Sequence, residues 1–127
     1  MNEYGEDKKK LVLNKFKNEI DSGKIQVDLG LSTDVVNQYE DGYFDWIYID
    51  TDHGYEVTKA ELEIYRTKVK KGGIIAGHDY ILGNWRAMIK YGVIESVHEF
   101  CVNHNWEIIH LTMEGSNFPS FALREIQ

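Results

Sequence analysis

The sequence is short of cysteine, proline and positive charge, and each shortage excludes a class of protein. A single cysteine, Cys101, rules out an intrachain disulfide and fits a reducing cytoplasm. One proline and no low-complexity tract argue against a disordered chain or a linker. The net charge of -7 argues against a general nucleic-acid binder. No apolar run is long enough to span a membrane, and the charged first residues are unlike a signal peptide. We therefore expect one cytoplasmic domain, residues 1–127, with a small-molecule substrate.

Helical and strand patterns alternate along the chain. Apolar residues at helical spacing predict helices, and apolar runs or alternating patterns predict strands. The expected helices span residues 6–22, 32–42, 55–73 and 85–103, and the expected strands span 24–30, 43–50, 73–80, 106–112 and 120–126. Alternation of this kind is typical of parallel strands joined by right-handed crossovers, whereas the last two strands, joined by residues 113–119, suit an antiparallel pair. The sequence predicts an α/β three-layer sandwich with a mixed sheet.

Two of the predicted strands end in polar residues. Asp50, Asp52 and His53 follow one strand, and His78 and Asp79 follow the next. In sheets of this kind ligands bind outside the carboxyl ends of the strands, and converging carboxylates and histidines suit a divalent cation. The alternative is that each polar group caps a turn or a helix where its strand leaves the core.

The stretch "FDWIYIDTDHGYEVTKAELEIYRTKVKKGGIIAGHDY", residues 44–80, resembles the second half of class I S-adenosylmethionine-dependent methyltransferases. It is most similar to the metal-dependent O-methyltransferase-like group, and "YGVIESVHEFC", residues 91–101, continues the match. The resemblance runs from about Leu11 to the end of the chain. It implies a partial Rossmann-like sheet and S-adenosylmethionine as the cofactor.

The resemblance also assigns roles to particular residues. It implies that Asp50, His78 and Asp79 are metal ligands and that His53 is the general base. A histidine replaces the usual acid at position 78, so a softer transition metal, or no metal, remains open beside magnesium. Histidine changes charge near neutral pH, which suits a residue that takes a proton there.

The cofactor side of the resemblance is incomplete. Ser32 matches a serine that contacts the adenine, whereas Leu31 replaces an acidic residue of the family. The family's glycine-rich turn, and the acid that binds the ribose, have no counterpart before Lys24. The resemblance therefore implies the C-terminal portion of a methyltransferase, with doubtful cofactor binding.

Two strands of the family would then be missing beside strand 43–50, which would have an unpaired edge. Strand 24–30 could pair with this edge directly, a second copy of the chain could cover it, or a separate polypeptide could supply the missing half. We expect a homodimer or a rearranged sheet.

Three functions remain open from the sequence. The leading one is O-methyl transfer to a small molecule by a truncated, weakly active or inactive methyltransferase. The alternatives are a non-catalytic module for oligomerisation or partner binding, and a metal-dependent hydrolase that uses the three predicted metal ligands. Tyr80, Trp85 and Arg86, in the stretch "YILGNWR", are candidates for lining the substrate pocket.

Overall fold

The structure is a computed structural model that describes residues 3–113 and 118–127, in two units. The first unit, Met1–Gly30, contains helices α1 (Glu3–Lys15) and α2 (Lys17–Asp21), neither of which has a buried residue. The predicted helix 6–22 is confirmed, with a break at Phe16. The predicted strand 24–30 is wrong: these residues, all of them described, form no strand. A strand needs a partner for its backbone groups, and none of the described strands pairs with this segment.

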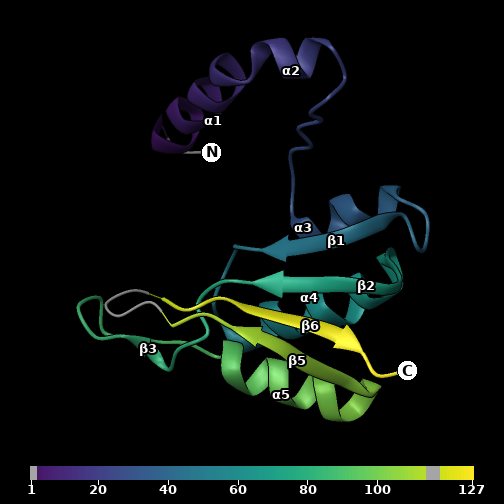
Figure 1. Cartoon of the computed structure of the whole chain (residues 1–127). Helices are drawn as coiled ribbons and strands as arrows, with labels where there is room; N and C mark the ends of the chain where they lie inside the picture. Colours follow the sequence, from purple (N-terminus) through teal and green to yellow (C-terminus); the bar gives the residue numbers. More distant parts are fainter. Residues whose placement is uncertain (1–2, 114–117) are drawn as a thin grey trace. The chain divides into compact units, whose positions relative to one another are not determined.

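The second unit, Leu31–Gln127, contains a four-stranded mixed sheet. Its strands are β1 (Phe44–Ile49), β2 (Val69–Gly77), β5 (Trp106–Leu111) and β6 (Phe121–Glu125), and their order is β1-β2-β6-β5 (Figure 1). β1 and β2 are parallel, whereas β6 runs antiparallel to both β2 and β5. The mixed α/β sheet and its C-terminal antiparallel pair are confirmed. The predicted connection 113–119 includes residues 114–117, which lie outside the described residues.

Helices α4 (Tyr55–Lys68) and α5 (Val93–His104) pack against each other, α4 also contacting β2 and α5 contacting β5. The centre of the core is formed by fully buried side chains from both helices and both central strands: Leu62, Val97, Ile75 and Leu123. Ile75 pairs with Leu123 across β2 and β6, so the two side chains lie on the same, covered face of the sheet. α4 is the crossover that makes β1 and β2 parallel neighbours.

Three predicted helices are shorter than expected. Helix 32–42 ends at Gln38. Helix 55–73 ends at Lys68, because Val69 already pairs with Phe44 as the first residue of β2. Helix 85–103 begins only at Val93. The residues before it form a small hairpin of β3 (Gly83–Asn84) and β4 (Ile89–Lys90). Ile89 fits the four-residue repeat of α5 by spacing alone, and its pairing with Asn84 takes it out of the helix.

β1 is an edge strand in the described part of the chain. It pairs with β2 on one side, and no described strand lies on its other side. Trp46 is 62% exposed and Tyr48 46% exposed, so the face of β1 that carries these two side chains is open to solvent. Short helices α3 (Ser32–Val35) and η1 (Val36–Gln38) precede it. Among the described residues, no helix combines the length and apolar character needed to cross a membrane.

Candidate active site at the carboxyl edge of the sheet

The parallel pairing of β1 and β2 brings the first two predicted ligands together. Ile49 pairs with Gly77 at the ends of the strands, and the amide of His78 donates a hydrogen bond to the carbonyl of Ile49 over 2.9 Å. Asp50 and His78 are the next residues of the two strands. Their meeting therefore follows from the register of the sheet.

Asp79 completes a cluster of three donor groups. The Nδ1 atom of His78 lies 3.7 Å from Oδ1 of Asp50 and 3.2 Å from Oδ1 of Asp79. One donor atom from each residue lies within 4.8 Å of the other two. Asp79 has a positive φ of 63°, a conformation that aspartate tolerates better than most residues and that is common at functional sites. Two carboxylates and an imidazole at this spacing can hold a divalent cation.

His53 lies in the loop between β1 and α4, and its position is fixed at both the backbone and the ring. The amide of Gly92 donates to the carbonyl of His53 over 2.8 Å, and the ring centroid of His53 lies 3.8 Å from that of Tyr91. A Cβ atom at position 92 would lie 2.5 Å from the backbone nitrogen of Tyr55, so this close approach requires glycine.

The predicted base and the three predicted ligands share one small cavity. His53, Asp50, His78 and Asp79 all line a space of about 10 Å³. A space of this size holds about one water molecule. The structure therefore brings together four of the five predicted site residues.

Ser32 and Asp52 are each held by a contact within the protein, although Asp52 also lines the small cavity. Asp52 accepts a hydrogen bond from the amide of Gly54 over 2.6 Å, which forms the local turn before α4. Ser32 donates its hydroxyl to Oε1 of Glu61 over 2.6 Å. It does not cap α3 with its side chain, because the residue at the N-cap is Leu31. The contact between Ser32 and the adenine therefore stays a prediction, and the hydrogen bond of the Ser32 side chain to Glu61 does not support it.

Glu61 is a buried carboxylate that the sequence reasoning missed. Its side chain is fully buried, and it accepts hydrogen bonds from Ser32 and, over 2.7 and 2.8 Å, from the hydroxyl of Thr51. Thr51 directly follows Asp50, so Glu61 anchors the loop that carries Asp50 and His53. The signal was in the spacing, since Thr58, Glu61, Leu62 and Tyr65 are the buried residues of α4 and repeat with helical period.

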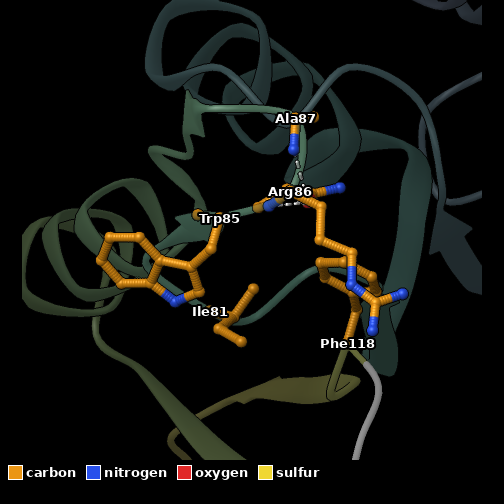
Figure 2. Close-up of a pocket in the computed structure, with 7 residues that line it drawn as sticks. Ile81, Trp85, Arg86, Ala87 and Phe118 are labelled. Atoms are coloured by element: carbon orange, nitrogen blue, oxygen red, sulfur yellow. Dashed lines mark hydrogen bonds between the residues drawn. The ribbon is translucent and has the colours of Figure 1, made fainter.

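A larger pocket lies beside the β3–β4 hairpin. Its volume is about 580 Å³, and its lining includes Ile81, Trp85, Arg86 and Phe118 (Figure 2). Trp85 and Arg86 were predicted from the sequence, whereas Phe118 was not.

Tyr80, the third residue predicted for that pocket, is not among those that line it. Its hydroxyl lies 2.6 Å from Nε2 of His98 on α5, and its ring packs near Phe121 of β6. Burial raises the pKa of Tyr80. Tyr80 therefore ties the end of β2 to α5, which is a structural role.

A family model described as a methyltransferase domain matches residues 6–80. The chain belongs to this family. The match includes β1, α4, β2 and four of the site residues, Asp50, His53, His78 and Asp79. No curated protein matches the chain in sequence.

Solved methyltransferases share the fold of this methyltransferase domain. A putative DNA modification methylase from Thermus thermophilus aligns with a TM-score of 0.56 at 6% identity, covering 78% of this chain and 53% of its own. The O-methyltransferase from Bacillus cereus, solved in complex with SAH, aligns with a TM-score of 0.53 at 19% identity, covering 77% and 48%. A SAM-dependent methyltransferase from Methanosarcina mazei aligns with a TM-score of 0.51 at 9% identity, covering 80% and 67%.

These likenesses confirm the Rossmann-like α/β fold that the sequence predicts. At these sequence identities the solved structures support the fold and no particular activity. The methyltransferase domain spans about half the length of the first solved structures that it matches.

Proposed function

We propose that this chain carries the acceptor side of an S-adenosylmethionine-dependent O-methyltransferase site with a small-molecule substrate. The family match supports methyl transfer. The observation that carries the proposal is the meeting of Asp50, His78 and Asp79 within 4.8 Å at the carboxyl edge of the sheet, with His53 on the same cavity. The family match favours neither a non-catalytic module nor a hydrolase.

The donor set fits a divalent transition metal better than magnesium. Imidazole suits metals such as iron, nickel and zinc, whereas magnesium prefers oxygen ligands alone. Asp50, His78 and Asp79 would hold the ion, and such an ion would polarise a substrate hydroxyl. His53 is the base of the proposal: its imidazole takes the proton of the acceptor hydroxyl, and its ring is held for this by the contact with Tyr91.

The cofactor fits these residues less well than the metal does. The side chain of Ser32, the one predicted cofactor contact, is bonded to the buried Glu61. The sequence before Lys24 contains no glycine-rich turn of the kind that the family uses. We therefore propose that the 127-residue chain alone binds S-adenosylmethionine weakly. Calorimetric titration with S-adenosylhomocysteine tests this, and a micromolar dissociation constant would contradict it.

Zinc titration by calorimetry tests the cation site. We expect Asp50→Ala to weaken Zn²⁺ binding at least about tenfold, because it removes one of the three proposed protein ligands. Asp45→Ala is the matched control, since Asp45 is an exposed acid on the same strand and pairs with Lys70. Equal binding by wild type and Asp50→Ala, or no binding by either, would sink the metal assignment.

The base is tested by methyl transfer to phenolic acceptors at high donor concentration. His53→Gln should lower the turnover about a hundredfold, the usual contribution of a positioned base. His110→Gln, on β5, is the control that should leave the rate unchanged. Equal loss in both variants, or no loss in His53→Gln, removes His53 from the mechanism.

The outer edge of β1 supports a further part of the proposal, which is that a second copy of the chain pairs with it. Segment 24–30 is not a strand, which leaves a second copy of the chain or a separate polypeptide to cover this edge, and we propose the second copy. With Ile47 of each copy opposite Ile47 of the other in an antiparallel pair, Asp45 faces Ile49, and no acid faces an acid. Light scattering should give twice the monomer mass for wild type, and Ile47→Pro should give a monomer. A monomeric wild type would contradict the pairing.

A further inference from the structure

The pocket beside the hairpin has the size and walls of a small-molecule site. Its volume of about 580 Å³ falls within the range of roughly 300–1,000 Å³ that is usual for such sites. In Figure 2, Ile81, Trp85 and Phe118 present apolar or aromatic side chains around the space, and the Arg86 side chain extends beside Phe118. Walls of this kind favour a flat, largely apolar ligand.

The local structure of the hairpin holds its pocket residues in place. The side-chain oxygen of Asn84 accepts hydrogen bonds from the amides of Arg86 and Ala87, each over 3.1 Å. Gly83 pairs with Lys90, and a Cβ atom at Gly83 would lie 2.5 Å from the carbonyl oxygen of Ile89. The close strand contact and the bonded turn fix the backbone from which Trp85 and Arg86 project. The pocket is therefore largely preformed, which lowers the entropic cost of binding.

Arg86 supplies a positive charge to this pocket. Among the described residues that line it, Arg86 is the only charged one and no acid is present, and its guanidinium makes no ion pair within residues 3–113 and 118–127. The nearest cation along the hairpin, Lys90, instead lies 3.8 Å from Glu95. A guanidinium binds a carboxylate through two parallel hydrogen bonds, a geometry that neither lysine nor a neutral donor reproduces.

Phe118 connects this pocket to the proposed active site. It lines the pocket, and its ring centroid lies 6.3 Å from that of His78 and 6.0 Å from that of Tyr91. Tyr91 in turn contacts His53. One side of Phe118 therefore belongs to the pocket and another to the residues that would act on a hydroxyl.

We propose that the pocket binds a planar aromatic carboxylate, with the carboxylate on Arg86 and the ring between Trp85 and Phe118. Combined with the proposed function, on which this last step rests, the methyl acceptor is a hydroxylated aromatic acid. Its hydroxyl lies at the end of the ring away from the carboxylate, toward Asp50 and His78. Arg86 is then the residue that selects an acidic acceptor over a neutral one.

A pair of isosteric probes tests the charge preference, by ligand-observed NMR titration in the absence of metal and cofactor. The probes are 4-hydroxycinnamate and its neutral amide. Wild type should bind the carboxylate about tenfold more tightly than the amide, because only the carboxylate makes a charge-assisted pair with Arg86. Arg86→Gln should remove this preference. Lys90→Gln, which removes one positive charge from the same hairpin outside this pocket, should keep it.

Three results would overturn the inference. These are equal binding of both probes by wild type, a preference that survives in Arg86→Gln, and a preference that is lost equally in Lys90→Gln. A third variant, Trp85→Ala, should weaken the binding of both probes alike, and unchanged binding would contradict the role of Trp85 as an aromatic wall. Probe binding without any methyl transfer would count against the proposed function alone, whereas methyl transfer without the charge preference would count against this inference alone.

Discussion

β1 and β2 are neighbouring parallel strands with similar apolar segments, yet the structure treats them differently. β2 has a partner strand on each side, and its Ile75 is fully buried. β1 has a partner on one side among the described strands, and its Trp46 and Tyr48 are largely exposed. The difference shows that an apolar strand in a sequence indicates a surface that packs against another part of a protein. That other part need not belong to the described sheet.

The largest effect should separate the two strands directly. Ile75→Ala should lower the free energy of unfolding by about 3 kcal/mol, because it leaves a cavity in a fully buried site. Trp46→Ala should cost less than about 1 kcal/mol in the monomer, since its side chain is already in water. Urea unfolding monitored by circular dichroism measures both. Similar losses in the two variants would mean that β1 is covered in solution.

A smaller effect should show how firmly the end of β1 is held. Glu61→Ala should cost about 2 kcal/mol, because it leaves a cavity at a fully buried position and removes the acceptor of the Ser32 and Thr51 hydroxyls. Glu56→Ala, an exposed acid in the first turn of α4, is the control and should cost under about 0.5 kcal/mol. Equal urea midpoints for the two variants would show that the loop bearing Asp50 does not depend on Glu61.

The two strands also differ in how well the sequence predicted them. β2 and its polar end were predicted because "GGIIAGHDY" combines an apolar run with a helix-ending glycine pair, although Val69 to Gly72 went to the helix. β1 was predicted as a strand with an unpaired edge, but the exposure of its Trp46 and Tyr48 was not predicted, because it depends on what covers that face of the sheet. Its expected neighbour, 24–30, alternates like a strand in the sequence and yet forms no strand in the structure.

The site shows the same division between local and tertiary information. Asp50, His78 and Asp79 could be placed together because parallel register brings adjacent strand ends to one edge. Phe118 could not be placed at the site from the sequence. It precedes β6, and it reaches the site only because β6 pairs antiparallel with β2. Ser32 was assigned by family resemblance, and its bond to Glu61 needed the packing of α3 on α4 to be known.

A still smaller, pH-dependent effect concerns the helices on the covered face. Hydrogen bonds from Tyr55 and Lys59 hold the pKa of Glu99 below its ordinary value of 4.5. A carboxyl with a lowered folded pKa stabilises the fold fully above its ordinary value and loses that contribution as pH falls through the folded value. The urea midpoint of wild type should therefore fall more steeply below about pH 4.5 than that of Glu99→Gln. Parallel pH profiles would show that this link between α4 and α5 adds nothing.

The smallest effect concerns Cys101 on α5, which is partly buried. Burial raises the pKa of its thiol above the ordinary value of 9.0, and only the thiolate reacts with alkylating reagents. At pH 8 the Cys101 thiol of the native protein should therefore react with iodoacetamide several-fold more slowly than the same thiol of the urea-unfolded chain. Cys101→Ser supplies the blank. A native rate equal to the unfolded rate would mean that α5 leaves this side chain open to solvent, and the covered face of the sheet would then be no better protected at this position than the exposed face of β1.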